Sequence, residues 1–278
     1  MAAGDAGRAA VAEAARLRWH GGAAEAGYRH LAEEVPVALT YDRVTYAVMM
    51  ASPADLADFA VGFSLTERII AGAGEIAELD VVEVPDGIEL RMSLVGDRRE
   101  ALERRMRRIA GPTGCGLCGL DSLAEAGRMP VRVAGDLCCT PAALLAAMDA
   151  IAPLQTLNAA TRAVHAAAFW RPGGGIVALR EDVGRHNALD KLAGALLRPG
   201  TRADDGVVLL TSRISFELVQ KAAGLGAPMI AAVSAPTALA LRTAEAAGIT
   251  LAGIVRTDGF ELFTHPHRVQ TETALASG

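Results

Sequence analysis

The chain has 278 residues, which is enough for one large domain or two ordinary ones. Apolar residues make up 51% of it, and this argues against disorder over most of the length. Aromatic residues make up only 4% and the net charge is −5, so neither a base-stacking surface nor a general polyanion-binding surface is expected. We therefore predict that the chain binds no nucleic acid.

The first eighteen residues contain no long apolar core followed by a cleavage site, so they do not read as a secretory signal. Residues 222–241 carry no charge and have the length of a membrane span, but glycines and prolines interrupt them. We interpret this stretch as a helix end, a buried strand and a helix start. The expectation is a cytoplasmic protein that does not enter a membrane, in a compartment where thiols stay reduced.

The first half predicts a flexible leader over residues 1–30, with two possible helical turns, and a small α+β domain over residues 31–110. A helix is expected from Ser52 as N-cap, with Pro53 in its first position, to about Ile70. The other predicted elements are a hairpin of Val35–Tyr41 and Val44–Met50, a second hairpin of Val81–Val84 and Ile88–Leu94, and a basic helix over Arg98–Ile109.

The second half, residues 111–278, alternates strands with helices and predicts an α/β layered domain. Its last strands are short apolar runs, as expected for parallel strands that are covered on both faces. Strands are predicted at Val164–Trp170, Ile176–Arg180, Val207–Thr211, Met229–Val233 and Leu251–Val255, and helices at Pro141–Ile151, His186–Leu197, Phe216–Leu225 and Thr237–Ala247.

Cys115 and Cys118 lie in the segment Gly111–Gly119, which has four glycines in nine residues. A helix predicted to follow at Asp121–Ala126 would stabilise a thiolate. Four interpretations remain open: half of a zinc site, a disulfide oxidoreductase, a nucleophilic or sulfur-carrying thiol, and ordinary loop cysteines. Cys138 and Cys139 could complete a zinc site only with an unfavourable spacing, and we expect them to be small apolar residues near a helix start.

The segment Arg180–Lys191 packs seven ionisable residues into a strand-to-helix junction. Backbone amides at the helix start, together with Arg185 and His186, could bind an anion. The alternative is a capped helix that carries surface ion pairs.

Two further segments follow predicted strands of the α/β domain. Ser212 and Arg213 come after one strand, and the segment Ile254–Gly259 ends another. Ligands bind outside the carboxyl ends of strands in open α/β sheets, so these residues are candidate ligand contacts. His165, on an apolar strand, is expected to be a core residue.

Nine segments of the chain, taken in order, resemble the FdhD family of formate dehydrogenase accessory sulfurtransferases. These segments are Glu34–Leu39, Met50–Leu56, Gly62–Ile70, Cys115–Gly119, Val164–Ala168, Glu181–Lys191, Ser212–Lys221, Ala232–Thr237 and Thr264–Pro266. The resemblance implies a small N-terminal domain and a cytidine-deaminase-like C-terminal domain without that enzyme's zinc site. No metal site is therefore expected.

The same resemblance implies a chemistry and its partners. The chain would accept sulfur from a cysteine desulfurase as a persulfide on Cys115, with Cys118 as helper. It would pass the sulfur to molybdenum bis(molybdopterin guanine dinucleotide), bound as substrate, for a formate dehydrogenase. GDP would be an analogue of this ligand, and a homodimer is expected. A chaperone that binds the cofactor without transferring sulfur is the alternative.

The resemblance also assigns the ligand contacts. The cofactor-binding segment would be Ile254, Val255, Arg256, Thr257, Asp258 and Gly259. Asp258 is acidic, so it would serve a phosphate-rich ligand only by contacting the guanine ring. Arg185, His186, Ser212 and Arg213 complete the predicted set.

Overall fold

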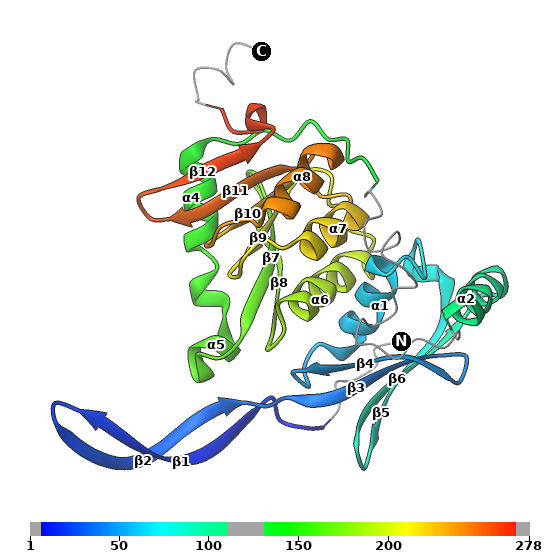
Figure 1. Ribbon diagram of the computed structural model, residues 1–278, viewed down its shortest axis with the longest axis horizontal. Coiled ribbons are helices and arrows are strands. Elements are labelled where there is room, and N and C mark those ends of the chain that lie inside the picture. Colours follow the sequence, from blue (N-terminus) through cyan, green and yellow to red (C-terminus); the bar gives the residue numbers. More distant parts are fainter. Residues whose placement is uncertain (1–6, 110–130, 271–278) are drawn as a thin grey trace.

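The computed structural model describes residues 7–109 and 131–270 of the chain. In these residues it contains a two-stranded, a four-stranded and a six-stranded sheet. Figure 1 shows the four-stranded and six-stranded sheets in separate halves of the molecule, with helices between them, and the two-stranded ribbon extending to one side. The predicted α/β class is confirmed.

The four-stranded sheet belongs to the N-terminal half and has the order β4-β3-β6-β5. Its strands are β3 (Val35–Tyr41), β4 (Val44–Ala51), β5 (Ile76–Val84) and β6 (Gly87–Leu94). The predicted hairpin of β3 and β4 is confirmed. Asp42 and Arg43 both have positive φ, 47° and 72°, as the tight two-residue turn between twisted strands requires.

Helix α1 (Leu56–Thr66) packs on this sheet, and α2 (Gly96–Ile109) follows β6. The predicted N-cap Ser52 is wrong, because α1 begins four residues later. Asp55 precedes the helix in a left-handed conformation, and its side chain makes no capping hydrogen bond. Ser52 is instead buried, and its backbone and side chain are hydrogen-bonded to the second half of the chain.

The helical turns predicted near the N-terminus are also wrong. Strands β1 (Val11–His20) and β2 (Ala23–Ala32) form an antiparallel hairpin in register from Val11 opposite Ala32. Gly21 and Gly22 turn the chain with φ of 59° and 81°. A Gly-Gly pair between two strands is the standard sequence for such a turn. The high alanine content concealed this signal.

The six-stranded sheet has the order β12-β11-β10-β9-β7-β8. Its three central apolar strands are parallel, as predicted, because β10 pairs in parallel with both β9 and β11. Strand β12 was not predicted and adds an antiparallel edge. The strands are β7 (His165–Arg171), β8 (Gly175–Asp182), β9 (Val207–Leu210), β10 (Met229–Ala232), β11 (Thr250–Arg256) and β12 (Gly259–Thr264).

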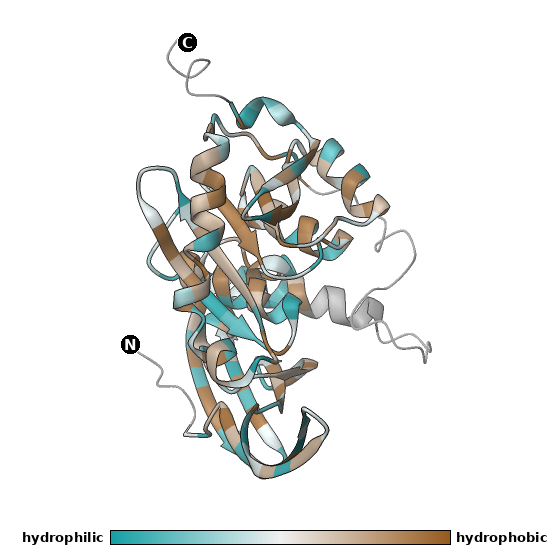
Figure 2. Cartoon of the chain, turned by 90° about the vertical axis from the view of Figure 1, so that its left-hand side faces the viewer, coloured by the Kyte–Doolittle hydropathy of each residue, from teal (hydrophilic) through white to brown (hydrophobic). Residues whose placement is uncertain are grey.

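Helices cover both faces of this sheet. One face packs against α6 (Arg185–Leu197), α7 (Phe216–Leu225) and α8 (Ala238–Ala247), and the other packs against α4 (Pro141–Asp149). Figure 1 shows α4 on the side opposite to α6–α8, and Figure 2 shows hydrophobic strands between these layers. The two apolar faces explain why the central strands lack an alternating pattern.

The remaining helical elements are short: α5 (Thr156–Thr161) and the 3₁₀ turns at Ala73–Glu75, Ala152–Leu154 and Pro266–Arg268. Across residues 7–109 and 131–270, no helix combines the length and the apolar character needed to cross a membrane. The uncharged stretch 222–241 divides into the end of α7, strand β10 and the start of α8, as predicted.

The two halves meet where α1 crosses α6. A Cβ atom on Gly62 of α1 would overlap the backbone oxygen of Asp190, and one on Gly194 of α6 would overlap the backbone oxygen of Asp58. Glycine on both helices therefore permits a backbone-to-backbone approach. This contact fixes the N-terminal half against the start of α6, where candidate ligand residues lie.

Candidate functional site

The predicted ligand residues lie along one edge of the six-stranded sheet. Ser212 and Arg213 follow β9, and Arg256 ends β11, which runs in the same direction. Strand β7 is antiparallel to β9, so His165 at its start lies at the same edge and pairs with Asp182 at the end of β8. We call this the carboxyl edge; the starts of α6 and α7 also lie along it.

Three helices, α6, α7 and α8, present their N-termini at the carboxyl edge, and the Thr237 side chain caps α8. The residues that precede α6 and α7, Gly184 and Ser215, make no capping side-chain hydrogen bond to them. In α7, the Glu217 carboxylate occupies the first turn. Burial raises the pKa of Glu217, but hydrogen bonds from Ser215 and from its own amide prevail and lower it. The start of α6, beside Arg185, is therefore the more suitable of the two for an anion.

His186 lies in the first turn of α6 and reaches α7. Its Nε2 atom is 3.3 Å from Ser215 Oγ and 3.8 Å from a Glu217 carboxylate oxygen. Burial, the largest cause, acts together with the neighbouring charges of Arg185 and Lys221 to lower the pKa of His186 to about 4. The ring is therefore neutral at physiological pH and offers one donor and one acceptor. The positive charge of this edge comes from its arginines.

His165, which we expected to be a core residue, is only half-buried at the edge. Burial lowers its pKa, and the nearby Arg185 guanidinium adds to this effect. His165 and His186 thus both favour the neutral form around Arg185. Sequence analysis missed the position of His165 because the first residue of an apolar strand looks like its buried neighbours.

The predicted cofactor-binding segment forms the hairpin between β11 and β12. Ile254 adopts a left-handed conformation with φ 53°, which is unfavourable for a β-branched residue. The strand register is irregular between Gly253 and Arg256, and Arg256 then pairs with Gly259. Arg256, Thr257 and Asp258 are exposed at the tip. Backbone strain of this kind is concentrated at functional sites, where it orients side chains.

The Arg180–Lys191 segment was predicted to form either an anion site or surface ion pairs. Most of its charged side chains do neither. Asp182 accepts hydrogen bonds from the amides of Ser52 and Gly184, at 3.0 and 2.7 Å, and from Asn187 Nδ2 at 3.0 Å. Lys191 Nζ lies 2.6 Å from Asp182 and donates to the Ser52 carbonyl oxygen at 2.9 Å. The motif thus holds a buried network that joins the two halves, and the interpretation as surface ion pairs is wrong for these residues.

A second buried pair involves Asp190, the residue next to Lys191 in α6. Asp190 accepts from Thr66 Oγ1 at 2.6 Å and from Lys221 Nζ at 2.8 Å, so α1, α6 and α7 meet at one carboxylate. Burial alone would lower the pKa of Lys221, but Asp190 and Glu67 raise it above its usual value. The ammonium group is thereby held in its charged form within the interior.

The charged residues at the start of the motif also make internal contacts. Glu181 accepts from the amides of Leu157 and Asn158, both at 2.8 Å, and so caps α5. Arg180 donates to Asp58 of α1, and Arg198 contacts the other oxygen of the same carboxylate. Only Arg185 and His186 of the motif remain available to a ligand at the carboxyl edge.

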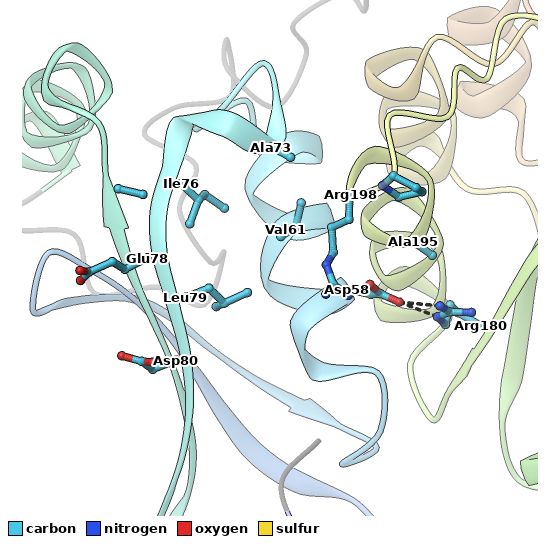
Figure 3. A pocket seen from close by; sticks show the side chains of 12 residues that line it. Asp58, Val61, Ala73, Ile76, Glu78, Leu79, Asp80, Arg180, Ala195 and Arg198 are labelled. Carbon is cyan, nitrogen blue, oxygen red and sulfur yellow. Dashed lines mark hydrogen bonds and ion pairs between the residues drawn. The ribbon is translucent and has the colours of Figure 1, made fainter. Parts of the chain in front are cut away.

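Two cavities lie elsewhere, and their linings contain none of the predicted ligand residues. One, of about 830 Å³, lies between α1, β5 and α6 and is lined by Asp58, Arg180 and Arg198 among others. Figure 3 shows Asp58 directed toward the two arginines within it. The other, of about 800 Å³, lies over β3, β5 and β6 and has acidic and basic residues in its lining. In both, carboxylates offset the arginines, so a polyanion is poorly matched.

The predicted catalytic residues Cys115 and Cys118 lie outside the described residues. Cys138 is exposed and Cys139 is buried. Burial raises the pKa of Cys139 to about 11, which makes its thiol a poor nucleophile. Within the described ranges, no group of three or more histidine, cysteine, aspartate or glutamate side chains could hold a metal ion. The zinc alternative for the Cys115 segment stays untested.

The chain after residue 130 follows the amino edge of the six-stranded sheet, opposite to the carboxyl edge. The Val133 amide donates to the carbonyl oxygen of Ala247 at the end of α8. Cys139 forms a bridge with Val269, close to the start of β11. The segment that carries Cys115 is thus followed by a stretch on the side away from Arg185 and Arg256.

The chain is similar to proteins named sulfur carrier protein FdhD. The one from Agrobacterium fabrum is 52% identical over 260 residues, which cover 92% of this chain and 94% of that protein. The one from Cupriavidus necator is 46% identical, covering 99% of this chain and 96% of that protein.

A solved structure gives the same result for the fold. It comes from Desulfotalea psychrophila and is described as a candidate formate dehydrogenase accessory protein. It matches with a TM-score of 0.72 at 24% identity, over 94% of this chain and 100% of that one. A family model, that of the FdhD/NarQ family, matches residues 32–270. From these matches over nearly its whole length, the chain belongs to the FdhD/NarQ family.

Proposed function

We propose that this chain is a sulfur carrier that sulfurates the molybdenum cofactor of a formate dehydrogenase. The observation that carries the proposal is a Cys-Gly-Leu-Cys motif, Cys115–Cys118, in a chain about half identical to proteins named sulfur carriers. A cysteine desulfurase would be the donor, and the catalytic subunit of formate dehydrogenase would receive the product. The chain would act in the cytoplasm as a homodimer.

The first step is transfer of one sulfur atom to Cys115. The Cys115 thiolate attacks the outer sulfur of the donor's persulfide, the S–S bond of the donor breaks, and its cysteine leaves as a thiolate. Cys115 then carries the sulfur as Cys–S–SH. A glycine-rich segment suits this step because glycine permits backbone conformations that other residues resist.

The second step is release of sulfur toward the cofactor, which is the substrate. Attack of the Cys118 thiolate on the inner sulfur of the Cys115 persulfide forms a Cys115–Cys118 disulfide and expels HS⁻. Two electrons pass from the cysteine pair to the outer sulfur, so the transferred atom arrives as sulfide. A thiol reductant must then restore the pair.

The carboxyl edge supports binding of a substrate that carries two guanine nucleotides. Arg185, Arg213 and Arg256 supply positive charge, and the start of α6 supplies backbone amides for a phosphate. The neutral His186 and the Ser215 hydroxyl group offer hydrogen bonds without adding charge. These donors fit pyrophosphate groups, and we assign them to the substrate's nucleotide ends.

The test uses a cysteine desulfurase and ³⁵S-cysteine. The wild-type chain should acquire label that a thiol reductant removes, and it should activate a formate dehydrogenase that was made without it. Cys115→Ala should lose both properties, whereas Cys138→Ala, at an exposed cysteine outside the motif, should retain both. Labelling and activation by Cys115→Ala would overturn the proposal.

A chaperone that binds the cofactor without transferring sulfur is the second candidate, because the carboxyl edge needs no cysteine to bind a nucleotide. The double variant Cys115→Ala/Cys118→Ala distinguishes the two. If it binds GDP like the wild type and still activates formate dehydrogenase, the chaperone function is correct and sulfur transfer is not.

A further inference from the structure

Strand β5 is the outermost strand of the four-stranded sheet on the side opposite to β4, and β6 is its one partner among the described strands. Five consecutive residues of this strand, 76–80, line the cavity of about 830 Å³ between α1, β5 and α6, which we call the β5 cavity. Side chains alternate between the two faces of a strand, so a wall of consecutive residues is the edge of the strand. The β5 cavity therefore borders backbone N–H and C=O groups of an edge strand.

The opposite wall of the β5 cavity is formed by α1 and the end of α6. Val61, Ala195 and Pro199 give this wall an apolar surface. Figure 3 shows Ile76 and Leu79 of β5 directed toward these helices, so the inner side of the cavity is apolar. An exposed sheet edge beside apolar side chains is the kind of surface to which an extended peptide adds as a further strand.

The two arginines of the β5 cavity are already balanced by carboxylates of the chain. Arg180 donates to one oxygen of Asp58 at 2.6 and 2.8 Å, and Arg198 donates to the other oxygen. Arg180 also lies 3.2 Å from a carboxylate oxygen of Asp55. The other charged side chains of the lining are two carboxylates of β5, so the charge that the cavity offers to a ligand is negative.

These two carboxylates, Glu78 and Asp80, are exposed, and Figure 3 shows them directed away from α1. Glu78 accepts a long hydrogen bond of 3.4 Å from Ser93. Arg91 is paired with Asp80 across the two strands, but its Nε atom bonds to Glu89 at 2.7 Å. Neither carboxylate of β5 is thus balanced by a neighbouring cation of the described residues. Basic side chains on a strand added beside β5 would supply that balance, as opposite charges do in cross-strand pairs.

The far end of β5 already has an occupant of this kind, supplied by the chain itself. The Arg8 guanidinium group donates to the carbonyl oxygen of Val84 at 3.2 Å and lies 4.0 Å from the Glu83 carboxylate. A basic residue there contacts both the backbone and an acidic side chain of the strand. A second copy of β5 is a poor occupant for the rest of the edge, because edge-to-edge pairing would bring carboxylates beside carboxylates.

We propose that the β5 cavity binds an extended peptide of a partner protein, with alternating apolar and basic side chains, as a fifth strand of the sheet. Its apolar side chains would contact Val61, Leu79 and Ala195, and its basic side chains would lie beside Glu78 and Asp80. Five extended residues span about 17 Å, the length of the strand edge at residues 76–80. The lining contains no cysteine and no predicted ligand contact, so this surface does not depend on the proposed sulfur transfer.

Fluorescence polarisation on the full chain tests the proposal with capped, carboxyfluorescein-labelled peptides. The peptide Val-Lys-Val-Lys-Val should bind saturably, and Val-Glu-Val-Glu-Val should not. The basic peptide with a methyl group on every backbone nitrogen keeps both charges but cannot donate to a strand, and it should bind at least tenfold more weakly. Absence of saturable binding of the basic peptide at about 1 mM overturns the proposal. Equal affinity of the methylated peptide overturns it as well.

Variants of the two walls place the peptide in the cavity. Glu78→Gln/Asp80→Asn should weaken binding of Val-Lys-Val-Lys-Val about tenfold through loss of two cross-strand charge pairs. Ala195→Leu should weaken it comparably, because the larger side chain fills the apolar side of the cavity. The control Glu245→Gln/Glu261→Gln removes two exposed carboxylates from α8 and β12 and should bind like the wild type. Wild-type affinity in either variant of the cavity contradicts the proposal.

Hydrogen exchange measured by mass spectrometry locates the bound peptide independently. The backbone amides on the free edge of β5 gain partners in the complex, so exchange should slow within residues 76–84. Strand β4 is the other edge strand of the same sheet and serves as the internal control, in which exchange should stay unchanged. Slower exchange in β4 without any change in β5 would show that the peptide joins the other edge, and the assignment to the β5 cavity would be wrong.

Discussion

Lys191 Nζ lies 2.6 Å from Asp182 Oδ2, and both side chains are completely shielded from solvent. Replacing Lys191 by methionine keeps the bulk of the side chain but leaves a buried carboxylate without its counter-charge. Removing one partner of a buried pair costs about 3–5 kcal/mol. We expect Lys191→Met to lower the free energy of unfolding by this amount, measured by urea denaturation.

The matched control is a surface pair of the same type. Arg202 bonds to Asp204, and the arginine side chain is almost fully exposed. Surface ion pairs contribute little to the free energy of unfolding, because water and salt already screen both charges. Arg202→Met should therefore leave the urea midpoint nearly unchanged. A small loss in Lys191→Met, comparable with that of the control, would mean that Asp182 gains solvent or another partner.

This buried network also marks the limit of prediction from sequence. The sequence Ser52-Pro53 has the local pattern of a helix start, and local patterns were sufficient for the β3–β4 hairpin and the parallel strands β9–β11. Ser52 instead bonds to Asp182, 130 residues later in the chain. No local pattern reveals such a partner, so the same charges were interpreted as surface pairs or as an anion site.

The ribbon shows a different kind of failure, in which the signal was present. Gly21-Gly22 directly follows Arg16-Leu17-Arg18-Trp19-His20, in which polar and apolar side chains alternate, and this is a hairpin pattern. Alanine, with its high helix propensity, outweighed the alternation in the prediction. At the carboxyl edge, strand direction alone brings Ser212, Arg213 and Arg256 to one side, so this part of the site was predictable.

The crossing of α1 and α6 predicts opposite effects for two glycine-to-alanine substitutions within helices. A methyl group at Gly62 would meet the backbone of Asp190 and force the helices apart. Gly224 of α7 is exposed, with no atom near the position that a methyl group would take. Gly62→Ala should lower the free energy of unfolding by several kcal/mol, whereas Gly224→Ala should raise it by about 0.5–1 kcal/mol.

Thermal and urea denaturation of the two variants measure this difference. Both substitutions raise helix propensity equally, so propensity alone would move both midpoints upward. A higher midpoint for Gly62→Ala would show that α1 and α6 separate without cost, and the close contact would then not hold the two halves together.

The lowered pKa of His186 leads us to expect that the folded chain loses stability in acid. Burial, together with Arg185 and Lys221, lowers its pKa from 6.5 to about 4 in the folded chain. Between these values the unfolded chain binds a proton that the folded chain does not, so the folded state loses stability as pH falls. The stabilisation is complete above about pH 6.5 and declines toward pH 4. After discounting for partial exposure, we expect about 1–2 kcal/mol from this residue.

The measurement compares the wild type with His186→Asn. The free energy of unfolding is determined by urea at several pH values between neutral and about pH 4.5. The wild type should lose more stability than the variant over this range. Equal losses in both proteins would show that His186 becomes protonated in the folded chain without cost, in disagreement with its partly buried position near Arg185 and Lys221.

Arg256 and Asp258 at the tip of the β11–β12 hairpin predict how the proposed nucleotide site discriminates between bases. Arg256→Ala should weaken GDP binding about tenfold through loss of a charge-assisted hydrogen bond. Arg202→Ala serves as the control, because this arginine precedes β9 at the opposite edge of the sheet. Isothermal titration with GDP measures both, and equal affinities for the two variants would exclude Arg256 from the site.

Asp258 gives the sharper test, because the two possible orientations of the nucleotide predict changes of opposite sign. If the carboxylate accepts hydrogen bonds from the N1 and N2 groups of guanine, Asp258→Asn should weaken binding of GDP and leave that of ADP unchanged. If the carboxylate faces the phosphates, removing its charge relieves repulsion, and the variant should bind both nucleotides more tightly. We expect the first result, because an acidic residue beside Arg256 would otherwise oppose the binding of a polyanion. Tighter binding of both nucleotides would reverse the assigned orientation.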